Sequence, residues 1–247
     1  MKKLRRITEA EIIHEFLKSE FYHPEYDADR ARFERLVYCA DLNDDMENAV
    51  RRALLFRRRG HMWRELPHDT QWWEMEFSTE EAQQVNIFPR AQWRAPARGN
   101  FAALNVAEQI RRDMLSEHPS PLAAKIKSLA MMLQAEGPKS TIMLIGINEQ
   151  RPLTMLEGNH RFVASLMLPQ DITLRRLRVT CGFSSHMEKC CWYKTNFPTL
   201  SHYLKNRIKY FWDREADVYR LLARTSPGAR GASRLAAPAE AQQLKSK

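Results

Sequence analysis

The sequence predicts an α+β protein, in which a small mixed sheet is packed against helices and the chain carries further helices at both ends. Three observations support this fold class. Residues 71–77 alternate apolar and polar side chains, which is typical of a strand with one buried face. Residues 141–168 have the pattern of strand, turn, strand, glycine-containing loop and helix. The first sixty residues repeat apolar side chains at helical spacing.

The charge balance favours anionic partners. The 247-residue chain has 39 Lys and Arg against 30 Asp and Glu, a formal net charge of +9. Such an excess suits nucleotides, nucleic acids or acidic surfaces. No apolar run approaches the ~20 residues that a membrane-spanning helix needs, and the basic N-terminus lacks the apolar region of a secretory signal. The four cysteines form no disulfide framework, which suits a reducing compartment. From these observations together we expect a cytoplasmic protein with no membrane partner.

Residues 1–66 are predicted to form an N-terminal helical region. Thr8 to Glu11 match a capping box and begin a helix that runs to about Phe21. A second helix is expected over residues 28–38. Asn43 or Asp44 is expected to cap a third helix that continues to Arg59 and ends at Gly60.

Basic side chains gather near the end of the third predicted helix: Arg57, Arg58, Arg59 and Arg64. One interpretation is a solvated surface whose positive charge complements the C-terminal end of the helix dipole. The other is a nucleic-acid contact, because the aromatic side chain of Trp63 is interleaved with these arginines and could stack on bases. The sequence leaves both interpretations open.

Residues 67–182 are predicted to form the central domain. After the strand at 71–77, Ser78 begins a short helix with a second capping box. Residues 87–94 are expected to be extended, and helices are expected over 106–115, with Asn105 as the cap, and over 122–135. Strands then follow at 141–147 and 152–156. Residues 172–180 alternate apolar side chains with arginines, which predicts an edge strand protected by charge.

The loop between the last apolar strand and its helix suggests a phosphate site. It reads Glu157-Gly158-Asn159-His160-Arg161. Gly158 permits a sharp turn and a close approach of a ligand to the backbone, and Asn159 is a favoured helix N-cap. The first turn of a helix presents unpaired N–H groups that attract anions. Arg161 adds donors whose geometry matches phosphate oxygens, and His160 adds a titratable donor.

These residues, extended to Ala164, resemble the nucleotide-phosphate loop of the ParB/sulfiredoxin-like superfamily, which carries a Gly-x-x-Arg element between a strand and a helix. The resemblance covers roughly residues 72–180. It implies a pocket for ATP or CTP. In a phosphotransferase, Glu157 would accept the proton of the substrate hydroxyl or bind Mg²⁺. In this superfamily a segment such as residues 87–94 lies near the ligand, so Arg90 is included among the phosphate-binding residues with Gly158, Asn159, His160 and Arg161.

Departures from the family pattern narrow the expected activity. Sulfiredoxins have a reactive cysteine at the position after the glycine, where this chain has Asn159. No helix-turn-helix of the kind that follows the nucleotide domain in ParB proteins is predicted. The loop is closer to the acidic-Gly-His-x-Arg loop of the amino-acid kinases in this superfamily, with Asn159 and His160 in changed order. The resemblance does not fix the reaction. Our first hypothesis is a phosphotransferase acting on a small hydroxyl-bearing metabolite, with Glu157 and His160 as catalytic residues.

Two other interpretations stay open at this point. In the first interpretation, the protein is a non-enzymatic nucleotide-gated regulatory protein that contacts nucleic acid through its arginines. In the other, the loop is purely structural, and Glu157 and Arg161 form an i,i+4 ion pair.

The C-terminal part is predicted to be a helical extension over residues 183–224, with a long helix from 200 to 222, followed by a disordered tail over 225–247. Cys181, Cys190 and Cys191 lack the paired spacing of a zinc site. We therefore expect no metal site here, and thiols that pack beside aromatic side chains.

Overall fold

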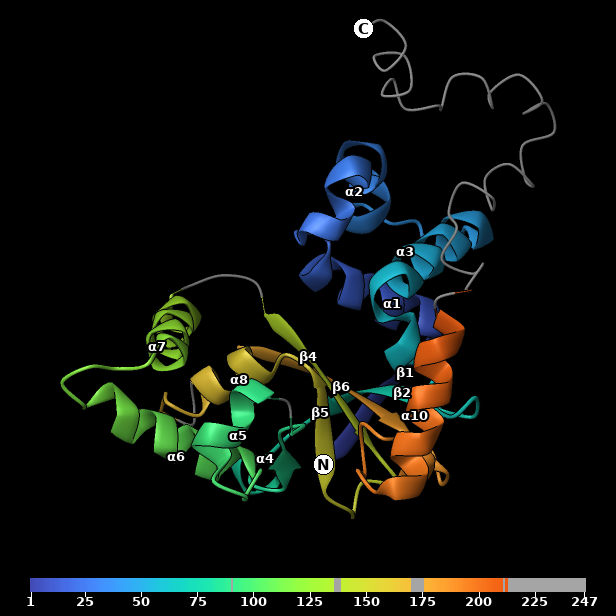
Figure 1. Cartoon of the computed structure of the whole chain (residues 1–247). Coiled ribbons are helices and arrows are strands. Elements are labelled where there is room, and N and C mark those ends of the chain that lie inside the picture. Colours follow the sequence, from blue (N-terminus) through green and yellow to red (C-terminus); the bar gives the residue numbers. More distant parts are fainter. Residues whose placement is uncertain (90, 136–138, 170–175, 211, 213–247) are drawn as a thin grey trace, which may run out of the picture.

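A computed structural model describes residues 1–89, 91–135, 139–169, 176–210 and 212 of the chain (Figure 1). The α+β class is confirmed. The strands are β1 (Lys2–Ile7), β2 (Gln71–Glu76), β3 (Val85–Asn86), β4 (Ser140–Gly146), β5 (Leu153–Glu157) and β6 (Leu177–Phe183). The α-helices are α1 (Glu9–Glu20), α2 (Arg30–Tyr38), α3 (Asp45–Trp63), α4 (Thr79–Ala82), α5 (Ala91–Ala97), α6 (Ala103–Met114), α7 (Pro121–Gln134), α8 (Asn159–Ser165) and α10 (Phe197–Tyr210). Two short 3-10 helices are η1 (Pro24–Asp29) and η2 (Met187–Lys189).

The strands form one six-stranded mixed sheet in the order β1-β2-β6-β4-β5-β3. The pairs β4–β6 and β3–β5 are parallel, and the pairs β1–β2, β2–β6 and β4–β5 are antiparallel. The chain reaches the middle of the sheet only at its fourth strand, after most of the helices have been made. Strand pairing therefore joins segments that are far apart in sequence.

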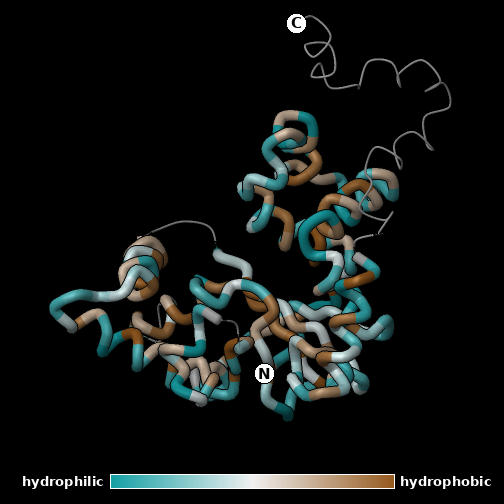
Figure 2. Tube along the Cα trace, in the orientation of Figure 1, coloured by the Kyte–Doolittle hydropathy of each residue, from teal (hydrophilic) through white to brown (hydrophobic). Residues whose placement is uncertain are grey.

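Helices cover both faces of the sheet, and β4 separates the two cores. Ile142 and Leu144 point into a core shared with α5, α6, α7 and α8, whereas Met143 and Ile145 point into a core shared with α1 and α3. Figure 1 shows α5–α8 on one side of the strands and α1–α3 with α10 on the other. Hydrophobic residues gather along the central strands in Figure 2, and hydrophobic and hydrophilic residues alternate along the helices. A strand that is buried on both faces is expected to be continuously apolar, as residues 142–145 are.

Several local predictions are confirmed. Both capping boxes are present, at Thr8 with Glu11 and at Ser78 with Glu81. Asp44 caps α3 by accepting hydrogen bonds from two backbone N–H groups. The side-chain oxygens of these residues satisfy N–H groups that the first helical turn leaves unpaired.

Predictions that depend on long-range packing are wrong at several positions. Residues 2–7 form the edge strand β1, which was not expected within a helical region. Gly60 does not end α3, because the helix continues to Trp63. Residues 91–94 belong to helix α5 and are not extended. Asn105 lies inside α6, and its side-chain amide donates to the carbonyls of Ala97 and Asn100.

The arginine-rich strand is also placed differently from the prediction. β6 lies between β2 and β4, so it is not an edge strand. The positive charge of Arg178 in β6 is neutralised within the fold, because Arg178 forms ion pairs with Glu15 of α1 and Glu74 of β2. A central strand can therefore carry an arginine because a helix and a neighbouring strand supply carboxylates to it. Residues 170–175 and 213–247, which include the predicted tail and the end of the long helix, lie outside the described residues.

A buried carboxylate ties α1 to α3. Glu20 is 3% exposed, and it accepts hydrogen bonds from Nε of Arg58 at 2.5 Å and from Nη2 of Arg59 at 2.7 Å. Burial raises the pKa of Glu20, but the bonds and charges of Arg59 and Arg58 outweigh burial and hold the pKa below its ordinary value of 4.5. The carboxylate is thus stabilised in its charged form by the helix that it contacts.

We predict that Glu20 contributes to acid sensitivity. Because its pKa is depressed in the folded state, its stabilising contribution is present above the unfolded pKa, near 4.5, and is lost as the pH falls through the lower folded pKa. The substitution Glu20→Gln leaves two arginines near an uncharged group and is expected to cost about 3–5 kcal/mol at neutral pH. Urea unfolding between pH 7 and pH 3 measures both effects. Equal acid slopes for wild type and variant would contradict this assignment.

Candidate functional site

The predicted loop joins β5 to α8 through a left-handed glycine. Gly158 has φ of +94° and is the N-cap of α8, so Asn159 is the first helical residue and not the cap that was predicted. A Cβ at Gly158 would lie 2.7 Å from Cγ2 of Ile142 and 3.3 Å from its Cα. Glycine is therefore required by the positive φ and by the close contact with β4. The N-cap glycine has no side chain that could cap the first turn of α8, so the first backbone N–H groups of this helix can donate to another hydrogen-bond partner.

The two charged residues of the loop form an ion pair. Nη2 of Arg161 lies 3.3 Å from Oε1 of Glu157, and their side chains are 26% and 19% exposed. This is the i,i+4 pair that the structural interpretation of the loop expects. The contact uses only one end of the guanidinium, so Nε and Nη1 of Arg161 remain able to donate to a ligand.

Two buried polar atoms, one at the start of α8 and one on α5 beside it, lack a hydrogen-bond partner in the part of the chain that the structure describes. Asn159 is 6% exposed, and among the described residues its Oδ1 has no hydrogen-bond donor. Trp93 of α5 is fully buried, its Nε1 likewise lacks an acceptor there, and its ring centroid lies 5.0 Å from that of His160. A buried polar atom without a partner costs roughly 1–3 kcal/mol. These atoms distinguish the loop from one whose polar groups are all satisfied by the fold.

Trp93 was not identified from the sequence as part of this site. Residues 87–94, which include Trp93, were predicted to be extended and close to the ligand, but only an arginine of this segment was predicted to bind phosphate. Helix α5 instead places the indole ring against His160. Arg90 lies outside the described residues, and Arg94 of α5 is exposed.

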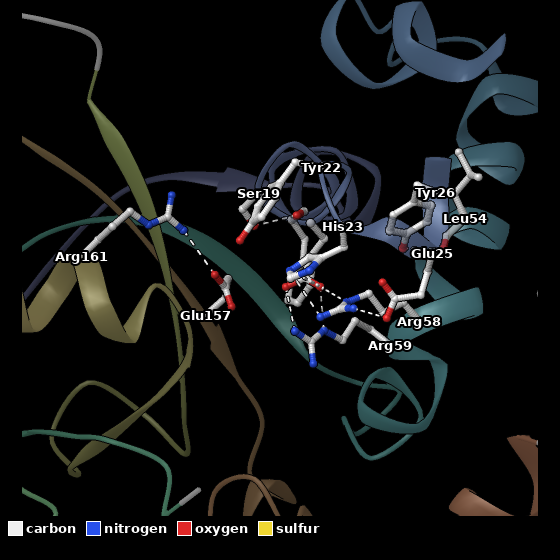
Figure 3. Close-up of polar contacts among 12 residues, drawn as sticks. Ser19, Tyr22, His23, Glu25, Tyr26, Leu54, Arg58, Arg59, Glu157 and Arg161 are labelled. Atoms are coloured by element: carbon white, nitrogen blue, oxygen red, sulfur yellow. Dashed lines mark hydrogen bonds and ion pairs between the residues drawn. The ribbon is translucent and has the colours of Figure 1, made fainter. Parts of the chain in front are cut away.

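The arginine cluster is largely engaged in internal ion pairs. Arg58 and Arg59 contact Glu20, Arg58 also contacts Glu25, and Arg57 contacts Asp29. Figure 3 shows the side chain of Arg58 reaching Glu25, with Arg59 beside it. The three consecutive arginines therefore hold helices together, in addition to any role at the surface.

The arginine cluster and the loop lie in the same region of the molecule. Burial lowers the pKa of Arg59, but hydrogen bonds and the charge of Glu20 raise it above its ordinary value, and the charge of Glu157 adds to this rise. Figure 3 draws Glu157 and Arg161 in the same close-up as Arg58 and Arg59. The charge of Glu157 in the loop thus acts on Arg59 of the arginine cluster.

A separate cavity of about 1190 Å³ was not predicted. It lies among the end of α3, residues 64–70, the segment around η2, and α10. Its lining includes histidines, cations and aromatic rings: Phe56, Trp63, Arg64, His68, His186, Lys189, His202, Lys209 and Trp212. The sequence prediction placed Arg64 in one cluster with Arg57, Arg58 and Arg59, but Arg64 lines this cavity and the other three do not. The interleaving of Trp63 with basic residues was the only sequence signal for this cavity.

The cysteines pack as expected. Cys181, Cys190 and Cys191 are all buried, and burial raises the pKa of Cys190 to about 12. Within the described ranges, no group of three or more His, Cys, Asp or Glu side chains is arranged to hold a metal ion. Among the helices that the structure describes, none combines the length and apolar character needed to cross a bilayer.

No family model, curated protein or solved structure matches this chain. The likeness of the loop to the ParB/sulfiredoxin-like superfamily therefore stays a prediction.

We predict that Gly158→Ala destabilises the protein more than Gly99→Ala does. Both glycines have positive φ, +94° and +87°, but a Cβ at Gly99 meets nothing within 4 Å. The two substitutions share the loss of unfolded-chain freedom and the strained backbone. Only Gly158→Ala adds the collision with Ile142, so we expect it to cost about 1–3 kcal/mol more. Chemical denaturation of the two variants measures the difference in the free energy of unfolding. Equal losses for the two variants would contradict the prediction and show that the loop moves away from Ile142 without cost.

Proposed function

We propose that the protein binds a nucleotide, ATP or CTP, through the loop from Glu157 to Arg161. The observation that carries this proposal is the buried side chain of Asn159, whose Oδ1 lacks a donor among the described residues. It lies at the start of α8, where a left-handed glycine leaves the first backbone N–H groups uncapped. A ligand that both donates and accepts hydrogen bonds would satisfy these groups together.

The donors and acceptors of the loop fit a phosphorylated ligand with hydroxyl groups. The first-turn N–H groups and the unused donors of Arg161 suit phosphate oxygens. Oδ1 of Asn159 accepts, so it suits a hydroxyl or amino group of the same ligand. His160 supplies a further ring nitrogen at this position. Glu157 has one of two roles in this proposal: its carboxylate accepts the proton of the substrate hydroxyl, or it binds Mg²⁺, which is commonly held through one or two carboxylates together with substrate phosphates.

The proposal includes a phosphotransferase reaction on a small hydroxyl-bearing metabolite. In this reaction the substrate oxygen forms a bond to the terminal phosphorus, the bond from that phosphorus to the nucleoside diphosphate breaks, and Glu157 accepts the hydroxyl proton. Arg161 would neutralise charge on the transferred group. Its ion pair with Glu157 holds both groups at the end of β5, within 3.3 Å of one another.

The alternative is a nucleotide-gated protein that contacts nucleic acid through Arg57, Arg58, Arg59 and Arg64. The ion pairs of the first three with Asp29, Glu20 and Glu25 weaken its support. A nucleic-acid phosphate would have to compete for those guanidinium groups with the buried carboxylates of Glu20 and Asp29 and with the exposed carboxylate of Glu25.

We predict that Arg161→Ala and Asn159→Ala each weaken nucleotide binding. Hydrogen bonds to charged groups contribute about 1.5–3 kcal/mol, so the Arg161 variant is expected to lose roughly 10- to 100-fold in affinity. Isothermal titration calorimetry with ATP, CTP and GTP in the presence of Mg²⁺ measures this loss. Arg35→Ala is the matched control, since Arg35 is exposed on α2 and far from the loop in sequence. The proposal fails if no nucleotide binds, or if Arg161→Ala binds as tightly as the control.

We predict that Glu157→Gln separates binding from turnover. The amide cannot accept the hydroxyl proton, and general-base catalysis typically contributes about 10²–10⁴-fold. If Glu157 is the base, nucleotide affinity is retained, because Arg161 is released from its carboxylate partner; a loss of affinity in the presence of Mg²⁺ assigns Glu157 to the metal instead. Phosphate transfer to a panel of hydroxyl-bearing metabolites should fall by that factor. Binding without turnover by the wild-type protein across the panel would remove the phosphotransferase part and leave the binding part standing.

A further inference from the structure

The cavity beside α10 has an excess of positive charge in its lining. Its carboxylates already have partners: Glu9 contacts Arg52, Glu65 contacts His202 and Asn206, and Asp69 contacts His186 and Ser184. Lys189 and Lys209 also line it, and neither has a carboxylate partner in the described part of the chain. The two ammonium groups are therefore available to an anion that enters the cavity.

The cavity also has a wall suited to a flat ring. Trp63 and Trp72 stack with centroids 6.0 Å apart and an interplanar angle of 12°, and Phe56 lies beside them in the lining. Trp212 lines the same cavity and is 77% exposed. Exposed tryptophan rings stack on planar groups, and such a contact is worth roughly 1–3 kcal/mol for a nucleobase.

Three imidazoles complete the lining, those of His68, His186 and His202. His186 is fixed by Asp69, with 3.0 Å between Nδ1 and Oδ2. His202 is fixed by buried Glu65, with 3.3 Å between Nδ1 and Oε2. In each ring the carboxylate contact orients the imidazole and leaves Nε2 to face another partner. The volume of about 1190 Å³ exceeds that of a typical small-molecule pocket, about 300–1000 Å³.

We infer that this cavity is a second binding site, for a phosphate group attached to a planar nucleobase. Lys189 and Lys209 bind the phosphate, and Trp212 stacks on the base. The site shares no lining residue with the loop from Glu157 to Arg161, so it is independent of the nucleotide site proposed there. A free mononucleotide and a nucleotide within a single strand offer the same chemistry.

The test measures binding of AMP, a ten-residue oligothymidylate and inorganic phosphate to the full chain, by calorimetry and by quenching of tryptophan fluorescence. The decisive variant is Lys189→Ala/Lys209→Ala, with Lys205→Ala as the matched control, because Lys205 is exposed on α10 and does not line the cavity. Circular dichroism melting confirms that each variant is folded. Trp212→Ala tests stacking separately, and Arg161→Ala tests independence from the loop.

We expect the double lysine variant to weaken AMP or oligothymidylate binding at least tenfold, and Trp212→Ala to weaken it several-fold, while Lys205→Ala and Arg161→Ala leave this site unchanged. Inorganic phosphate should bind much more weakly than AMP, since it has no ring. Binding of AMP at least as tight as the oligonucleotide identifies a free nucleotide. Tighter, salt-sensitive binding of the oligonucleotide identifies a single strand. The inference is overturned if neither probe binds, or if the double variant binds both as tightly as Lys205→Ala.

Discussion

The burial of β4 on both faces is the constraint on which the rest of the structure depends. Ile142 and Leu144 contribute to one core, and Met143 and Ile145 contribute to the other. Since successive side chains of a strand point to opposite faces, this one strand requires a helical layer on each side of the sheet. A polar side chain at any of these positions would be buried without water, at a cost that only a hydrogen-bond partner could offset.

The same strand positions the proposed site. The backbone of β4 and the side chain of Ile142 lie against Gly158, so α8 can begin there only with a residue that has no Cβ. This contact fixes the position of the first residue of α8 relative to β4 and to the end of β5. Asn159 is buried as a consequence, and Arg161 is directed back to Glu157. The geometry of the loop is thus a product of sheet packing, and a ligand would use groups that packing has already oriented.

The structure follows the sequence prediction where local chemistry decides it, and departs from the prediction where a distant partner decides it. The capping boxes at Thr8 and Ser78 and the apolar run of β4 each contain their own signal within a few residues. The prediction failed where the partner is distant: β6 has a charged edge-strand pattern, but Glu15 and Glu74 pair with Arg178 and make a central position possible. At the proposed site, the loop residues come from the sequence prediction, whereas the sequence did not indicate that Trp93 lies beside them. The cavity beside α10 was missed because four separate segments build it, and no single one of them has a ligand motif.

The most direct test of the proposed nucleotide site is a nuclear magnetic resonance titration that follows the backbone amides of residues 158–161 and the indole N–H of Trp93. That indole packs against His160 and has no hydrogen-bond acceptor among the described residues, so a ligand at the loop should alter its environment. We predict that ATP or CTP with Mg²⁺ shifts these resonances together, with one saturating concentration dependence. Nucleotide binding that leaves all of them unchanged would contradict the assignment of the site to this loop.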